Sequence, residues 1–190
     1  KRAFPVHLPI GFEQGINGIV DLVDMKAYTY TEFHDHELVQ GEIPADMLDQ
    51  VKKYRSLLIE NAVAEDEAML EKYFEVGEEG LTEEEIKQAI RTAVLTGKFF
   101  AVTGGDGRGV IVEKVLDMMV DYLPAPGDLK AVWGTHPKTG DEIERKHDST
   151  EPLAGLAFKI TTDPFVGKLA YFRVYSGKLE AGSYVLNSST

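Results

Sequence analysis

The chain has 190 residues, of which 43% are hydrophobic and 27% are charged, and its 32 acidic and 20 basic side chains give a formal net charge of −12. Nucleic-acid binding draws its affinity from clustered Lys and Arg side chains, so this balance argues against direct DNA binding. The sequence contains no Cys, which excludes a disulfide framework and a thiol nucleophile. Its apolar runs fall short of the roughly 20 residues that cross a membrane. Because the sequence begins at Lys1 rather than Met, we expect a chain processed or excised from a longer one.

The negative charge is concentrated in one segment. Residues 32–85 contain 17 acidic and four basic side chains, a net charge of −13, whereas the other 136 residues have a net charge of +1. Apolar residues recur regularly within this segment, which is unlike a disordered acidic tail. Two interpretations stay open: a solvated acidic helical face, or a docking surface for a basic partner guided by electrostatic complementarity.

Short strands are expected at the N-terminus. Extended apolar runs over 6–10, 18–23 and 25–30 predict three strands, and the pair Asp24-Met25 suits a reversal between the last two. We expect the same small sheet to continue toward residue 40.

Helical patterns follow Pro44. Apolar residues at intervals of three and four predict one buried helix face, made by Met47, Val51, Tyr54, Leu58 and Ala62. A second helical stretch is expected to stop at Gly77. A third begins with a capping-box pattern, in which Glu85 follows Thr82 by three positions, and ends at Gly97.

A strand, a glycine-rich turn and a helix come next, an order typical of an α/β layer. The strand is expected over 98–103 and the turn over 104–109. The helix is expected to end at Pro124 and to pack its apolar residues inward, namely Val112, Val115, Leu116, Met119, Val120 and Leu123.

The C-terminal part differs in composition. Residues 127–151 are polar, and we expect them to form a linker. Apolar, aromatic and β-branched residues then predict strands over 153–161, 168–175 and 183–186. Three strands cannot close a barrel, so we expect the start of a β-barrel or sandwich whose edge is exposed or completed elsewhere.

The glycine-rich turn is the first candidate for chemistry. A phosphate-binding loop needs Lys and then Ser or Thr after its last glycine, but Gly109 is followed by Val110 and Ile111. The spacing of the glycines does not match the dinucleotide-binding pattern either. We expect a structural turn or, as the alternative, a ligand-facing loop with exposed amides at a helix N-terminus.

A second candidate is His34-Asp35-His36, flanked by Glu32 and Glu37. On a strand the two His side chains would share one face and reach one ion. No third ligand follows at a diagnostic spacing, so a solvated polar edge strand is preferred and no metal site is predicted. There is also no Ser in a G-x-S-x-G pattern, so we predict no catalytic residue and no self-contained active site.

The tail carries a specific resemblance. It closely resembles the opening of domain II of bacterial elongation factor G, the translational GTPase that drives ribosomal translocation. The matching stretches of the tail are residues 152–160, 162–169, 172–179 and 182–185. Residues 4–11 and 18–28 resemble the insertion within the GTP-binding (G) domain of that family, called G′. Further matches lie at 58–62, 69–73 and 120–126, so the resemblance covers essentially the whole chain.

The resemblance implies a mixed α/β (α+β) fold: a remnant of a P-loop GTPase-type G domain with an α+β G′ insertion, followed by the first strands of a β-barrel. It implies the G′ insertion at 1–97, the last strand and helix of the G domain at 98–126, a linker at 127–151 and the start of domain II at 152–190. The family's P-loop, switches and N-K-x-D motif precede these segments and have no counterpart in this sequence.

The resemblance also implies a nucleotide. The parent protein would hydrolyse GTP with Mg²⁺, whereas this chain lacks the phosphate loop and is expected to bind no cofactor and not to catalyse alone. The family's fifth guanine-site motif, Ser-Ala-Leu or Ser-Ala-Lys, corresponds here to Gly104-Gly105-Asp106. Glycine lets the backbone approach guanine closely, although the family's serine is replaced.

A partner follows from the acidic segment. In this family a G′ helix docks the C-terminal domain of the ribosomal stalk protein through acidic residues. Glu60 fits that helix, and Glu67 lies seven positions on, two turns along the same face of a continuous helix. We therefore expect the ribosome and its stalk as partners, a cytoplasmic protein and a monomeric chain. An equal alternative is that the acids only keep the insertion soluble and away from ribosomal RNA.

Two other functions stay open. One is a paralogue of elongation factor G that acts in ribosome recycling or antibiotic protection, which would share the fold. The other is an autonomous acidic protein-interaction module without a GTPase parent.

Overall fold

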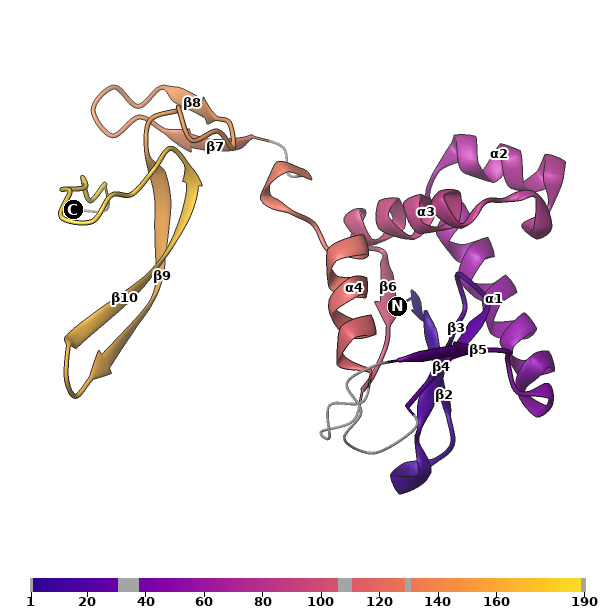
Figure 1. Ribbon diagram of the computed structural model, residues 1–190. Helices are drawn as coiled ribbons and strands as arrows, with labels where there is room; N and C mark the ends of the chain where they lie inside the picture. The colour runs from indigo at the N-terminus through magenta and orange to yellow at the C-terminus, as the bar shows by residue number, and fades with distance from the viewer. Residues whose placement is uncertain (1, 31–37, 106–110, 129–130, 189–190) are drawn as a thin grey trace. The chain divides into compact units, whose positions relative to one another are not determined.

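The computed structural model describes residues 2–30, 38–105, 111–128 and 131–188. The chain divides into two compact units, Lys1–Leu123 and Pro124–Thr190, and each is described by itself (Figure 1). The fold is mixed α/β, with helices and several small sheets. Among the described residues no helix is long and apolar enough to span a membrane.

A four-stranded antiparallel sheet forms the N-terminal part of the first unit. Its order is β2 (His7–Ile10), β3 (Gly18–Asp21), β4 (Lys26–Thr29) and β5 (Val39–Gly41). The predicted reversal between β3 and β4 is confirmed. The Asp21 carboxylate accepts the Val23 N–H at 2.8 Å, and Met25 turns the chain with a φ of 59°.

A second sheet in this unit pairs β1 (Arg2–Pro5) in parallel with β6 (Phe99–Val102). Val6 links the two sheets, because its N–H donates to the Val102 carbonyl at 2.9 Å and its own carbonyl accepts the Leu22 N–H at 2.9 Å. The sequence pattern predicted β6 but not β1, since the pairing joins segments that are far apart in the chain.

Three helices lie between β5 and β6 in the sequence: α1 (Leu48–Val63), α2 (Glu67–Val76) and α3 (Glu83–Leu95). The predicted face of α1 is confirmed, since Val51, Leu58 and Ala62 are fully buried. The predicted capping box at the start of α3 is also present, with both of its hydrogen bonds. Side chains from α1, α3 and the two sheets form one hydrophobic core.

The packing of the last helix of the unit, α4 (Val112–Tyr122), differs from the prediction. Five of the six residues expected to point inward are between 43% and 78% exposed, namely Val112, Leu116, Met119, Val120 and Leu123. Tyr122 is buried instead, and Met118 packs against the core. The reason is that α4 meets the unit through one side, where α3 lies, and no described residue covers the apolar side.

The second unit contains two hairpins. The predicted linker at 127–151 includes β7 (Val132–Thr135) paired with β8 (Glu142–Arg145), a hairpin that the sequence pattern did not predict. A tight turn explains this difference: the His136 N–H donates to the Asp141 carbonyl at 2.8 Å, and Gly140 adopts a φ of 78°.

The second hairpin confirms two predicted strands as β9 (Ala154–Asp163) and β10 (Gly167–Ser176). The Asp163 carboxylate accepts the Phe165 and Val166 N–H groups at 2.8 and 3.0 Å, which closes the turn between them. The strand predicted over 183–186 is not formed. A strand needs a neighbouring edge for its backbone hydrogen bonds, and none of the described strands pairs with these residues.

Candidate functional site

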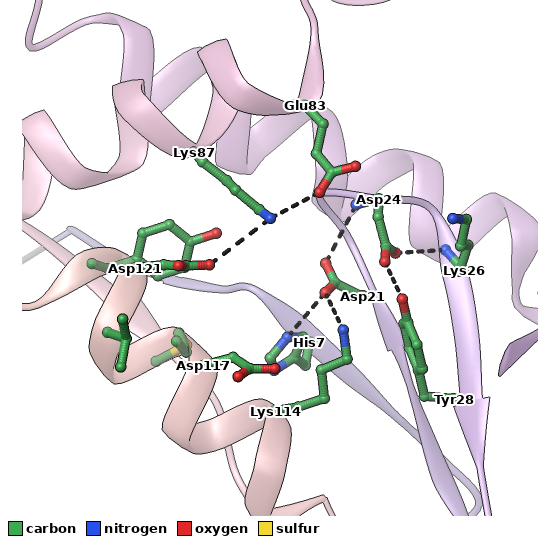
Figure 2. Close-up of a pocket in the computed structure, with 13 residues that line it drawn as sticks. His7, Asp21, Asp24, Lys26, Tyr28, Glu83, Lys87, Lys114, Asp117 and Asp121 are labelled. Atoms are coloured by element: carbon green, nitrogen blue, oxygen red, sulfur yellow. Dashed lines mark hydrogen bonds and ion pairs between the residues drawn. The ribbon is translucent and has the colours of Figure 1, made fainter. Parts of the chain in front are cut away.

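A polar pocket of about 410 Å³ lies in the first unit, between the four-stranded sheet, α3 and α4 (Figure 2). Its lining combines five acidic and three lysine side chains with one histidine. These residues are Asp21, Asp24, Glu83, Asp117, Asp121, Lys26, Lys87, Lys114 and His7. The pocket therefore gathers charges from strands and helices that are distant in the sequence.

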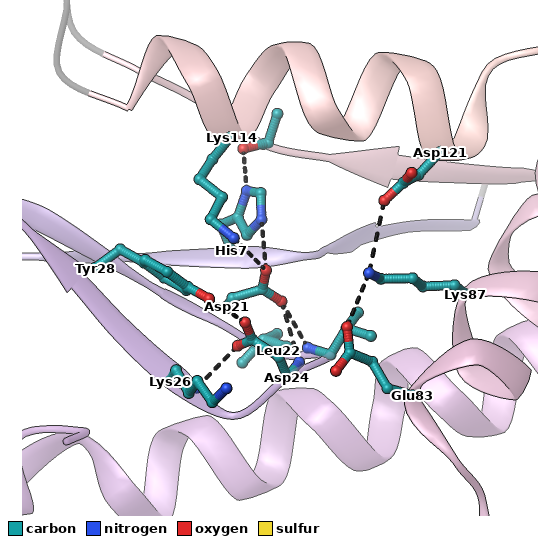
Figure 3. Close-up of polar contacts among 12 residues, drawn as sticks. His7, Asp21, Leu22, Asp24, Lys26, Tyr28, Glu83, Lys87, Lys114 and Asp121 are labelled. Atoms are coloured by element: carbon teal, nitrogen blue, oxygen red, sulfur yellow. Dashed lines mark hydrogen bonds and ion pairs between the residues drawn. The ribbon is translucent and has the colours of Figure 1, made fainter. Parts of the chain in front are cut away.

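His7 lies at the base of this arrangement and is only 8% exposed. Its Nε2 is 3.4 Å from the Asp21 Oδ2, and its Nδ1 is 2.7 Å from the Thr103 Oγ1 (Figure 3). Burial acts to raise the pKa of Asp21, but the hydrogen bond and charge of His7, the Val23 N–H and Lys114 outweigh it and lower that pKa. One histidine thus joins β2 to β3 and to the residue that follows β6.

Lys114 connects α4 to the same sheet. Its Nζ lies 3.7 Å from the Asp21 Oδ2 and 3.7 Å from the ring centre of Tyr28, a cation–π contact. The Tyr28 hydroxyl donates to Asp24. Burial, the hydrogen bond to Asp24 and the charge of Asp24 raise the pKa of Tyr28, so its hydroxyl stays protonated at neutral pH.

Lys87 connects α3 to α4. Its Nζ is 2.8 Å from the Glu83 Oε1 on its own helix and 3.9 Å from the Asp121 Oδ2 (Figure 3). The hydrogen bond to Glu83 is the main cause that raises the pKa of Lys87. In the described part of the chain no three His, Asp or Glu side chains are placed to hold a metal ion. The ion pairs of His7, Lys114 and Lys87 join β2, β3, α3 and α4.

The predicted guanine-loop residues Gly104 and Gly105 come directly after Thr103, whose side chain contacts His7. Both are exposed, and a side chain added at Gly104 would meet nothing within 4 Å, so backbone at this point is open to a ligand. Asp106 lies outside the described residues. The guanine contact stays a prediction.

Ile111 marks the other end of that loop in the sequence. It is buried against Ile19 of β3, with Tyr28 and Tyr30 packed around the pair. Its N–H donates to the Tyr30 hydroxyl at 2.7 Å, and that hydroxyl donates to the Glu113 Oε2 at 3.1 Å. Ile111 has a φ of 72°, an uncommon conformation for a β-branched residue, so the surrounding contacts must hold it.

The predicted docking residues Glu60 and Glu67 are both exposed, but they do not lie on one helix. Glu60 belongs to α1, whereas Glu67 is the first residue of α2. The chain breaks between them because the Asp66 carboxylate accepts the Met69 N–H at 3.2 Å and caps a new helix. The expectation of two turns along a single face is therefore wrong.

The structure shows a different acidic row. Glu67, Glu71 and Glu75 are exposed and recur every four residues along α2, which places them on one side of that helix. Phe74 beside them is 77% exposed. Sequence reasoning missed Glu71 and Glu75, although their spacing from Glu67 was the available signal. Burial and the charge of Glu60 raise the pKa of Tyr73 on α2.

The histidine and acidic candidates at 32–37 fall within residues 31–37, which lie outside the described residues. That hypothesis of a polar edge strand stays a prediction.

The C-terminal tail matches a known protein family. Residues 152–190 match the family Elongation factor G domain 2. The tail is thus similar to the second domain of a translation elongation factor, as the resemblance of residues 152–185 implied.

A solved structure is similar over more of the chain. It is the crystal structure of ttk003000868 from Thermus thermophilus, with 30% sequence identity and a TM-score of 0.71. The similarity covers 95% of this chain and 24% of the Thermus chain. The chain therefore spans about a quarter of the length of the protein that it matches.

Proposed function

We propose that the chain is a segment of a GTP-dependent ribosomal translocation factor related to elongation factor G. The match of residues 152–190 to domain 2 of that factor carries the proposal. The likeness to a much longer Thermus chain over 95% of the sequence supports it. In this proposal 1–97 form the G′ insertion, 98–126 end the G domain, and 127–151 lead into domain II.

The open faces of the first unit support a larger parent domain. Parallel sheets are normally covered on both faces, yet β1 and β6 form only a two-stranded parallel pair. Phe100 and Val102 on β6 are about half exposed, as is the apolar side of α4. In the proposed parent, further strands and helices of a GTP-binding domain would bury these side chains.

The parent would bind GTP with Mg²⁺, hydrolyse it and couple hydrolysis to movement of tRNA and mRNA on the ribosome in the cytoplasm. Gly104, Gly105 and Asp106 would supply the guanine side of that site. The chain by itself lacks the phosphate loop and the switches and would not hydrolyse GTP. A recycling or antibiotic-protection paralogue is the alternative that shares this fold.

Binding of fluorescent GDP tests whether the parent protein has the proposed guanine-nucleotide site. We expect the full-length protein to bind it and the 190-residue chain not to bind it. Failure of the full-length protein to bind any guanine nucleotide would favour an autonomous interaction module. Translocation and ribosome-splitting assays with the full-length protein then distinguish the elongation factor from a recycling paralogue.

The acidic side of α2 would dock the C-terminal domain of the ribosomal stalk protein. Three exposed carboxylates in a row, Glu67, Glu71 and Glu75, together with the exposed ring of Phe74, suit a basic partner with an apolar contact. Glu60 on α1 would extend this surface.

Titration of the chain with the stalk domain tests the docking. We expect Glu67→Lys and Glu71→Lys each to weaken binding roughly tenfold, and Glu60→Lys to weaken it less. Glu144→Lys on β8 is the matched control, because it changes net charge equally at an exposed site of the other unit. Equal losses for all of these variants would point to net charge alone and contradict a specific surface.

A further inference from the structure

Two side chains of the four-stranded sheet reach the chain on either side of residues 104–110. On the N-terminal side, the Nδ1 of His7 from β2 is 2.7 Å from the Thr103 Oγ1. On the C-terminal side, Tyr30 follows β4 and accepts the Ile111 N–H at 2.7 Å. Thr103 and Ile111 are thus both tied to one sheet.

Both contacts involve a residue that is buried in the first unit, His7 in one and Ile111 in the other. His7 is nearly buried and bridges to Asp21, which also lies 3.7 Å from Lys114 on α4. Ile111 is 1% exposed and lies against Ile19. The contacts at Thr103 and Ile111 therefore share the rigidity of β2, β3 and β4.

We propose that His7 and Tyr30 are positioning residues that set the placement of the Gly104 and Gly105 backbone at the guanine side of the nucleotide site. This inference rests on the proposed GTP-binding function, but its structural part does not require a nucleotide. It assigns to the sheet of the G′ insertion a role in shaping the guanine loop, in addition to carrying the acidic helices.

The chemistry of His7 allows its two contacts to be separated. An Asn amide reaches about as far as the Nδ1 of histidine, and a Gln amide about as far as the Nε2. His7→Asn should therefore keep a hydrogen bond to Thr103 and lose the one to Asp21. His7→Gln should do the reverse. Only the Gln variant is expected to release the chain at Thr103.

Tyr30→Phe removes one hydroxyl and keeps the ring that packs on Ile111. The Ile111 N–H then loses its acceptor while the hydrophobic contact stays. Tyr184→Phe is the matched control, because this side chain is fully exposed in the second unit.

The first measurement is made by NMR on the 190-residue chain. We expect amide exchange at Ile111 to become roughly tenfold faster in Tyr30→Phe, the change that corresponds to one lost hydrogen bond. In His7→Gln, but not in His7→Asn, the heteronuclear NOE of the Gly104 and Gly105 amides should fall. Exchange at Val20 and Leu58 in the core reports global stability, and a change at Ile111, Gly104 or Gly105 counts as local only where it exceeds the change at these two core amides.

The second measurement is the affinity of the full-length protein for fluorescent GDP. We expect Tyr30→Phe and His7→Gln each to weaken it roughly fivefold, and His7→Asn and Tyr184→Phe to leave it unchanged. Unaltered Ile111 exchange and glycine NOE values in the variants would overturn the positioning role. Altered loop dynamics with unaltered GDP affinity would overturn the link to the nucleotide.

Failure of the proposed GTP-binding function can be told apart from failure of the positioning role. If the wild-type full-length protein binds no guanine nucleotide, the GTP-binding proposal fails and the link to the nucleotide fails with it. The exchange and NOE data still decide whether the sheet positions the loop.

Discussion

The Arg91 side chain of α3 caps the C-terminus of α4, with its Nη1 2.7 Å from the Asp121 main-chain carbonyl. The same nitrogen lies 3.3 Å from the Val120 carbonyl and 3.3 Å from the Leu123 carbonyl. The last carbonyls of a helix have no hydrogen-bond partner within the helix and carry partial negative charge. A guanidinium therefore stabilises them both by donating hydrogen bonds and by its positive charge. This contact fixes where α4 ends against α3.

Removal of that cap should destabilise the first unit. We expect Arg91→Ala to lower its free energy of unfolding by about 1–2 kcal/mol, and Arg91→Lys to lower it less, because Lys keeps the charge without the planar fork. Urea unfolding followed by NMR signals of the first unit measures this. Arg145→Ala on β8 is the control and should leave that unit unchanged; an equal loss in both variants would contradict the cap.

Two adjacent leucines on α1 test the buried face of that helix. Leu58 is 0% exposed and Leu57 is 37% exposed. We expect Leu58→Ala to cost about 2–5 kcal/mol through lost burial and a cavity in the core. Leu57→Ala should cost less than about 1 kcal/mol, since its surroundings are open to water. Comparable costs in urea unfolding would show that the helix is rotated from the face described.

The capping box of α3 predicts a smaller effect. The Thr82 hydroxyl accepts the Glu85 N–H at 3.3 Å, and the Glu85 carboxylate accepts the Thr82 N–H at 3.0 Å. Thr82→Ala should destabilise the first unit by about 1 kcal/mol, whereas Thr82→Ser retains the acceptor and should be nearly neutral. Thermal unfolding of the two variants checks this, and a Ser variant as unstable as the Ala variant would contradict it.

Asp21 should make stability depend on pH in the acid range. Its pKa is lowered on folding, so its contribution is complete above the ordinary value of 3.8 and is lost as pH falls through the lower folded value. Between pH 6 and pH 2 we expect the difference in unfolding free energy between wild type and Asp21→Asn to shrink. A difference that stays constant over this range would show that the Asp21 charge does not matter.

Local patterns predicted much of the fold. The reversal at Asp24-Met25, the buried face of α1 and the capping box of α3 all follow from neighbours within four residues, and all are present. Each depends on turn chemistry, helical spacing or a hydrogen bond that the local sequence itself provides.

Other expectations failed where a distant partner decides the outcome. The 183–186 segment has strand-like residues, but the described strands offer it no pairing edge. The apolar side of α4 was expected to be buried, yet a periodic pattern shows only that a side is apolar and not what covers it. Glu60 and Glu67 were separated by the cap at Asp66, which shows that a constant spacing along the chain does not guarantee a continuous helix.

By itself the sequence determined the locally encoded elements, namely the reversal after β3, the buried face of α1 and the capping box of α3, together with the concentration of negative charge in 32–85 and the resemblance of the tail to domain II of elongation factor G. Only the tertiary structure decided that His7 and Tyr30 meet Thr103 and Ile111. The physical reason is distance along the chain. Helical spacing and caps act between neighbours, whereas the contacts of Thr103 and Ile111 depend on strands that lie about 80 or more residues away in the sequence.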